Sequence, residues 1–146
     1  MNCVIENDLN SIKKHLQRYL NYTLKDLNIK SAEMIFLRVL WGMENTSQIE
    51  VARKLDCDKS HIHRLTCKLL EKELIYFPEN YIDKTRNNIL KLTEKGKEII
   101  NRVNLTIETW LKKITSGIDK NEIDIFKKVI AKITQNANQI STETEK

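Results

Sequence analysis

The sequence predicts a mainly α-helical fold with one small β-hairpin. The chain of 146 residues holds one proline and three glycines, so little interrupts its helices. Apolar residues recur at spacings of three and four over most of the chain, which is the rhythm of amphipathic helices. This rhythm breaks between residues 74 and 92, where two short β-prone runs flank a polar stretch.

The N-terminal half predicts three helices. The first covers residues 4–27 and carries a continuous apolar stripe. Ser31 is a suitable N-cap for the second, which ends near Gly42. Ser47 and Glu50 have the spacing of a capping box, in which each side chain accepts a hydrogen bond from the backbone of the other, so a third helix begins there.

A short turn separates the third helix from a fourth. Asp58 can cap this fourth helix, predicted over residues 59–72, and its negative charge suits the positive end of the helix dipole. The remaining predicted elements are two strands over residues 74–77 and 89–92 and two long helices over residues 93–117 and 119–140.

Two short helices joined by a tight turn and followed by a β-hairpin form a winged helix-turn-helix, whose second helix enters the major groove of DNA. Ile62, Leu65 and Leu69 mark the core face of this helix, and the polar residues take the opposite face. The predicted DNA-binding residues on the helix are Lys59, Ser60, His61, His63, Arg64 and Lys68.

The hairpin tip adds a second predicted DNA contact through Lys84, Arg86 and Asn87. An arginine on such a tip can enter the narrow, electronegative minor groove. Residues 59–97 hold nine Lys or Arg against five Asp or Glu, which places +4 of the chain's net charge of +5 in this stretch. A local excess of positive charge is typical of a surface that binds a polyanion.

Several segments resemble one known family. They are residues 47–52 (SQIEVA), residues 58–60 (DKS) with Arg64, and Arg86 followed by residues 92–96 (LTEKG). Together they resemble the MarR (multiple antibiotic resistance regulator) family of winged helix-turn-helix transcription regulators. The resemblance by motif extends from about residue 31 to residue 96.

The resemblance implies a homodimer whose terminal helices interlock. We therefore expect a DNA-binding lobe over residues 31–97 and a helical dimerisation region over residues 1–30 and 98–146. The apolar stripes at both ends of the chain independently predict a partner surface that covers them. A twofold dimer would place two DNA-reading helices about 34 Å apart, so an inverted repeat is the predicted target.

The sequence departs from the family pattern at two places. Arg86 stands seven residues before Thr93, as in the family, but Lys84 occupies the position of the family's wing aspartate and Asp83 lies one residue earlier. Glu73 replaces the glycine with which the family usually ends the DNA-reading helix. We expect this helix to end differently or with mild backbone strain, because glycine best tolerates a left-handed conformation.

The resemblance also implies a cleft for a small aromatic or anionic effector between the dimerisation helices and the DNA-binding lobe. The alternative for each aromatic candidate is ordinary packing in the core or an interface. The candidates are His15, Arg18, Tyr19 and Trp41, together with Tyr22 and Trp110.

The cysteines do not predict a disulfide framework or a zinc ribbon, since the chain has three of them and no CxxC pair. Cys3 or Cys67 could instead serve as an oxidation-sensing thiol. We expect no metal or cofactor, because His61 and His63 diverge and Cys57 with His61 lacks further ligands.

No motif of a known enzyme class occurs, and we expect no enzyme activity. The N-terminus lacks the features of a signal peptide, and no apolar run approaches the roughly 20 residues that span a bilayer, so we expect a cytoplasmic protein without membrane contact. The predicted function is a sequence-specific DNA-binding regulator, a homodimeric repressor released by a small ligand or by thiol oxidation. The alternative is a winged-helix protein-interaction module that does not bind DNA.

Overall fold

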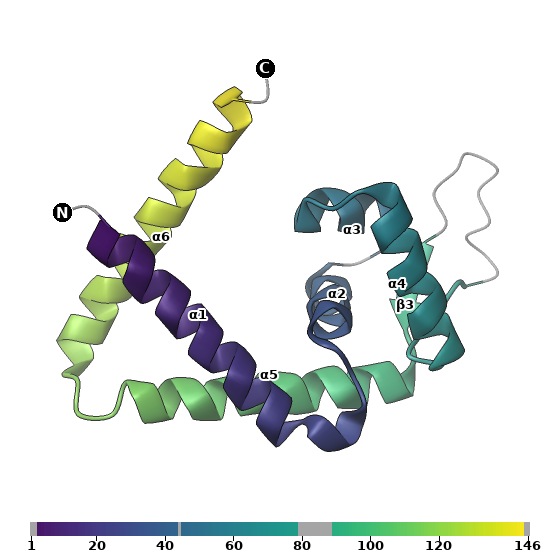
Figure 1. Cartoon of the computed structure of the whole chain (residues 1–146), viewed down its shortest axis with the longest axis horizontal. Helices are drawn as coiled ribbons and strands as arrows, with labels where there is room; N and C mark the ends of the chain where they lie inside the picture. Colours follow the sequence, from purple (N-terminus) through teal and green to yellow (C-terminus); the bar gives the residue numbers. More distant parts are fainter. Residues whose placement is uncertain (1–2, 44, 79–88, 145–146) are drawn as a thin grey trace. The chain divides into compact units, whose positions relative to one another are not determined.

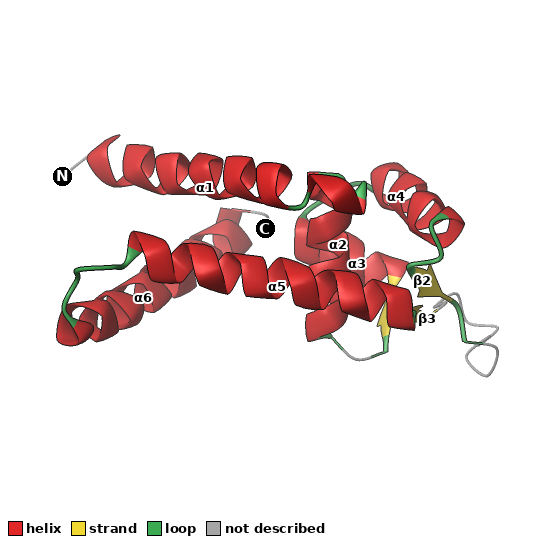
Figure 2. Cartoon of the chain, turned by 90° about the horizontal axis from the view of Figure 1, so that it is seen from below, coloured by secondary structure: helices red, strands yellow, loops and turns green. Residues whose placement is uncertain are grey.

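The computed structural model describes residues 3–43, 45–78 and 89–144 (Figure 1). The chain divides into two compact units, Met1–Trp110 and Leu111–Lys146. Helices dominate the described residues, with a small sheet in the first unit (Figure 2), and the predicted mainly α-helical fold is confirmed. The elements are α1 (Cys3–Thr23), the 3₁₀ helix η1 (Lys25–Leu27), α2 (Ser31–Gly42), β1 (Thr46–Ser47), α3 (Gln48–Leu55), α4 (Lys59–Glu71), β2 (Ile75–Tyr76), β3 (Ile89–Leu92), α5 (Glu94–Ile114) and α6 (Lys120–Thr144).

The core of the first unit is built from the apolar faces that the sequence predicts. α2 contributes Phe36 and Leu37, which are completely buried at 0% exposure. Leu69 of α4 packs into the same cluster, so the DNA-reading helix predicted from the sequence is anchored by its apolar side. Other members of the cluster come from α1, α3 and α5 and from the residue that follows α1, namely Leu20, Val51, Ile100, Val103 and Leu24.

The sheet has three antiparallel strands in the order β1-β3-β2. Thr46 of β1 lies opposite Leu90, and Ile75 of β2 lies opposite Leu92. The sequence predicts the pair formed by β2 and β3 but not β1, because a two-residue strand is too short to show the alternation by which strands are recognised. Since β1 directly precedes α3, its pairing with β3 ties the start of the helix-turn-helix to the hairpin.

The predicted start of α2 needs a correction. Lys30, not Ser31, is the N-cap: its backbone is extended, and Ser31 is already helical. The Lys30 N–H donates to Glu33 Oε2 at 2.9 Å, which satisfies one donor at the helix start. Ser31 Oγ instead accepts a hydrogen bond from Gln17 of α1 at 2.5 Å.

The predicted caps of α3 and α4 are confirmed. The Ser47 N–H donates to Glu50 Oε2 at 2.7 Å, and the Glu50 N–H donates to Ser47 Oγ at 3.3 Å, which is the reciprocal pattern of a capping box. The turn between the helices contains Asp56 in the left-handed region at φ 50°. Asp58 then caps α4 by accepting from the His61 N–H at 2.8 Å.

α4 ends in the hydrogen-bond pattern of a Schellman motif. The Leu74 N–H donates to the Leu69 carbonyl at 2.9 Å, and the Glu73 N–H donates to the Leu70 carbonyl, also at 2.9 Å. Glu73 holds φ 58°, the left-handed conformation that glycine adopts most easily. The helix therefore keeps the ending typical of glycine in spite of the glutamate, at a cost of about 1–2 kcal/mol in backbone strain.

The segment LTEKG forms a junction between the end of α4 and the start of α5. Thr93 Oγ1 donates to the Glu73 carbonyl at 2.7 Å and accepts from the Gly96 N–H at 3.0 Å. The Thr93 N–H donates to the Leu74 carbonyl at 3.0 Å. A β-carbon at Gly96 would lie 2.1 Å from the Leu74 oxygen, so this position requires glycine for close backbone approach.

A buried ion pair fixes the end of α4 to the start of α2. Lys72 Nζ lies 2.7 Å from Glu33 Oε2 and also donates to the Asn28 carbonyl at 2.8 Å. The Glu33 side chain is only 2% exposed, whereas that of Lys72 is 31% exposed. Burial raises the pKa of the Glu33 carboxyl, but the hydrogen bonds from the Lys72 ammonium and the Lys30 N–H outweigh it, and the pKa lies below its ordinary value.

This ion pair predicts a specific dependence of stability on pH. Because the pKa of Glu33 is lowered by folding, its contribution is present above the pKa of the unfolded chain and is lost as pH falls through the folded-state pKa. Replacing Glu33→Gln should lower the free energy of unfolding at pH 7 by about 1–2 kcal/mol, since the partly exposed Lys72 loses a charged partner. Urea denaturation of both proteins between about pH 7 and pH 3 measures the difference.

The difference in free energy of unfolding between the wild type and Glu33→Gln should narrow at acid pH, where Glu33 becomes neutral. Glu98→Gln is the control, because Glu98 is an exposed residue of α5. A gap that stays constant from neutral to acid pH would show that the Glu33 charge does not stabilise the fold.

The second unit holds the end of α5 and the 25-residue helix α6. None of the residues of α6 is buried. Its apolar side chains recur at helical spacing and remain largely exposed. They include Ile125, Phe126, Val129, Ile133 and Ile140, at 41–63% exposure. Within the part of the chain that is described, no helix is both long and apolar enough to cross a membrane.

Candidate nucleic-acid interface

The side of α4 that faces away from the core carries the predicted DNA-binding residues. Ile62, Leu65 and Leu69 are buried as predicted, and Thr66 joins them by donating from Oγ1 to the Ile62 carbonyl at 2.9 Å. At about 100° per residue, the opposite side is centred on Ser60, Arg64 and Cys67. All the predicted residues except the half-buried His61 are exposed, namely Lys59, Ser60, His63, Arg64 and Lys68.

A carboxylate already occupies the N-terminus of α4. The hydrogen bond from the His61 N–H to Asp58 stabilises the carboxylate and lowers its pKa, against a smaller opposing effect of burial. This hydrogen bond uses one of the helix's free N–H groups, and the carboxylate repels phosphate. A phosphate at this end of α4 would therefore have to be bound by side chains such as Lys59 rather than by the helix terminus.

Three lysines counted in the basic stretch have partners within the chain. Lys72 is held by Glu33, and Lys95 Nζ donates to the Lys72 carbonyl at 2.9 Å. Lys97 lies 2.6 Å from Glu94, and that hydrogen bond raises its pKa. The sequence could not separate these residues from Lys59 and Lys68, because their partners lie on other elements or depend on the local helix geometry.

The predicted wing contacts fall outside the described residues. Lys84, Arg86 and Asn87 belong to residues 79–88, as does Asp83. The base of the hairpin is described, and β3 pairs with both β1 and β2 there.

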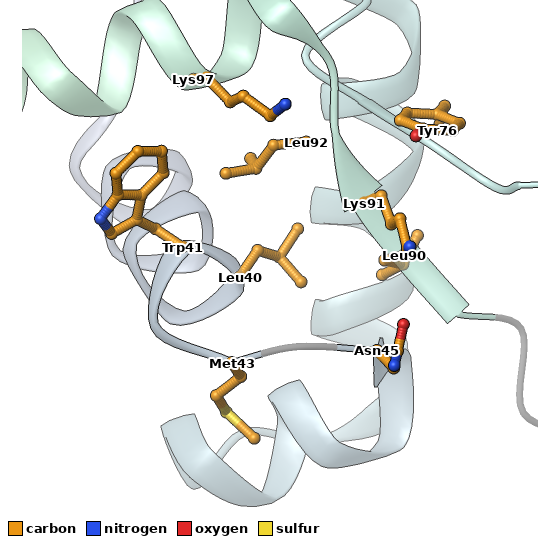
Figure 3. A pocket seen from close by; sticks show the side chains of 9 residues that line it. All are labelled: Leu40, Trp41, Met43, Asn45, Tyr76, Leu90, Lys91, Leu92 and Lys97. Atoms are coloured by element: carbon orange, nitrogen blue, oxygen red, sulfur yellow. The ribbon is translucent and has the colours of Figure 1, made fainter.

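The predicted effector residues do not converge on one site. His15 and Arg18 are exposed on α1 and Tyr19 is half-buried there, whereas Trp41 borders a cavity of about 500 Å³ between α2, the sheet and the start of α5 (Figure 3). None of the three α1 residues lines this cavity. Sequence reasoning missed its other walls, because they come from four separate segments: Leu40, Met43, Asn45, Tyr76, Leu90, Lys91, Leu92 and Lys97.

Two thiols are described, and both are free and half-buried. Cys57 Sγ donates to the Leu55 carbonyl at 3.3 Å in the turn before α4. Cys67 Sγ lies 3.6 Å from His63 Nε2, one helical turn away on α4. Among the described residues, no group of three or more His, Cys, Asp or Glu side chains surrounds a common point where a metal ion could bind.

No family sequence profile matches the chain. Its fold, however, is similar to several solved structures over nearly its whole length. A MarR transcriptional regulator from Methanosarcina mazei Go1 superposes with a TM-score of 0.81 and 20% identity over 93% of this chain and 97% of that one. This similarity shows that the chain has the fold of MarR-family regulators, as the LTEKG junction and the capped helix pair predict.

Two further structures come from S. aureus. A MepR–DNA complex superposes with a TM-score of 0.75 and 17% identity over 94% of this chain and 99% of that one. A MarR protein in complex with salicylate and kanamycin has a TM-score of 0.76 and 22% identity over 94% of this chain and 95% of that one. At these identities the comparison establishes the fold.

Proposed function

We propose that the chain is a DNA-binding transcription regulator of the MarR family, acting in the cytoplasm as a homodimer on an inverted-repeat operator. The observation that carries the proposal is the exposed face of α4, where Ser60, Arg64 and Lys68 project from a helix whose other side is locked into the core. The shared fold with a protein solved in complex with DNA supports it.

The chemistry of this face matches the major groove. Arg64 can donate two parallel hydrogen bonds to the N7 and O6 atoms of guanine, the commonest specific contact to a base. Ser60 can donate to or accept from a base edge, and Lys59 and Lys68 can neutralise phosphates on either side. The wing residue Arg86 keeps its predicted role in the minor groove.

The exposed apolar faces support the homodimer. α6 shows Phe126 at 55% and Val129 at 50% exposure, and α1 shows Val4 at 66% and Ile5 at 48%. Exposed apolar stripes on long helices are costly in water and mark an interface. A second copy of the chain would cover them in a twofold arrangement and present two α4 helices to DNA.

A dimer bound at an operator would act as a repressor by blocking access of RNA polymerase. The cavity beside Trp41 is the candidate site for a small effector, with apolar walls and the basic groups Lys91 and Lys97. A ligand can release DNA only if it binds the DNA-competent arrangement of the protein less tightly than an arrangement that cannot bind DNA. The S. aureus structure with salicylate supports a small-molecule effector for this fold.

The DNA interface predicts a loss of affinity in two different forms. After selection of an operator from a random DNA pool, Arg64→Ala should cost about 1–3 kcal/mol and relax the preference at one base position. Lys68→Ala should weaken binding to all sequences alike and reduce the dependence of affinity on salt, because one phosphate contact is lost. Fluorescence anisotropy at several salt concentrations measures both effects.

Lys128→Ala is the matched control, since Lys128 is an exposed lysine of α6. Equal affinities for wild type, Arg64→Ala and Lys68→Ala would contradict DNA reading by α4. The protein-interaction module would then become the better account.

The homodimer is tested separately from DNA binding. Sedimentation equilibrium should give about twice the chain mass of 17.2 kDa for the wild type. The double change Phe126→Glu and Val129→Glu should shift the protein toward the monomer, because charges would enter the apolar interface. Lys128→Glu changes charge on the opposite side of the same helix and should leave the dimer intact. A wild-type monomer at micromolar concentration, or an intact dimer in the double variant, would contradict this interface.

A further inference from the structure

A thiol and an imidazole lie side by side in the middle of the exposed side of α4. His63 and Cys67 are four residues apart, which brings their side chains onto the same strip of the helix. His63 Nε2 and Cys67 Sγ are 3.6 Å apart. His63 is exposed and Cys67 is half-buried, so ions in solution can reach both atoms.

The separation of the two atoms matches that of two ligands of one metal ion. Zinc binds cysteine sulfur at about 2.3 Å and histidine nitrogen at about 2.0–2.1 Å in tetrahedral geometry. Two such ligands at the tetrahedral angle of about 109° lie about 3.5–3.6 Å apart. The observed 3.6 Å therefore allows both atoms to bind one ion with little movement of either side chain.

We propose that His63 and Cys67 form a reversible binding site for a thiophilic divalent cation of the Zn²⁺ class. Binding replaces the thiol proton by the metal and releases that proton to solvent, with no change in oxidation state. Glu71 is one turn further along the helix, but the described residues include no group of three ligands around a common point. Water completes the coordination, so the site binds more weakly than a closed four-ligand site.

The location of the site has a consequence for DNA, and this consequence rests on the proposed function. Cys67 lies between Arg64 and Lys68 in sequence and shares their face of α4. A hydrated divalent ion at this point would occupy the space into which a base edge must enter. Metal and DNA should therefore exclude each other, and each should lower the affinity for the other by the same factor.

Metal binding is tested on the full chain without DNA. Titration with Cd²⁺ alone should produce the ultraviolet sulfur-to-metal charge-transfer band of a cadmium thiolate. The band should persist in the double variant Cys3→Ser and Cys57→Ser, whose remaining thiol is Cys67. It should disappear in Cys67→Ser, which keeps the other two thiols.

The contribution of the imidazole is measured in the same double variant. Adding His63→Gln should weaken Cd²⁺ binding at least about tenfold. The control His61→Gln, two residues earlier on the flank of the helix, should change the Cd²⁺ affinity less than about threefold. Circular dichroism confirms that each variant keeps its helices. A band that survives in Cys67→Ser, or unchanged affinity in the His63→Gln variant, would overturn the two-residue site.

Competition is measured with the selected operator fragment. Zn²⁺ should lower the DNA affinity of the wild type but not that of Cys67→Ser. Absence of operator binding in metal-free buffer would contradict the proposed function and leave the Cd²⁺ result standing. Operator affinity that is independent of Zn²⁺, in a protein that shows the Cd²⁺ band, would overturn the exclusion of DNA by metal.

Discussion

The C-terminal end of α4 is the point on which the arrangement of the first unit depends. Lys72 joins it to the buried Glu33 of α2, and Thr93 joins the next residue, Glu73, to the start of α5. The close approach of Gly96 to the Leu74 carbonyl leaves no room for adjustment between these segments. Because both α2 and α5 hold this end, the exposed face of α4 has a fixed direction relative to the core.

Much of this arrangement could be predicted from the sequence because its signals are local. The caps at Ser47 and Asp58 and the spacing of the α4 core residues depend on neighbours within one or two turns. The ion pair of Lys72 could not be predicted, since Glu33 lies 39 residues away and looks like a surface residue in the sequence. The sequence predicts Trp41 as an effector contact together with residues of α1, but its cavity is assembled from distant segments.

The structure also separates the lysines that have partners within the chain from the basic residues on the exposed face of α4. Lys72, Lys95 and Lys97 have partners within the chain, whereas Arg64 and Lys68 project from the outer side of α4. In the proposed homodimer, the partner would present a second copy of this face to DNA. The proposal of a homodimer thus links the exposed apolar faces of α1 and α6 to the exposed face of α4.

Photo-crosslinking tests most directly whether the N-terminal half of α4 enters the major groove. A benzophenone amino acid replaces exposed Ser60 of α4 or, as a control, exposed Glu108 of α5. The account predicts that the Ser60 probe forms a covalent product with bases of the selected operator and that the Glu108 probe does not. Crosslinking from Glu108 alone, or equal yields on operator and unrelated DNA from both positions, would contradict it.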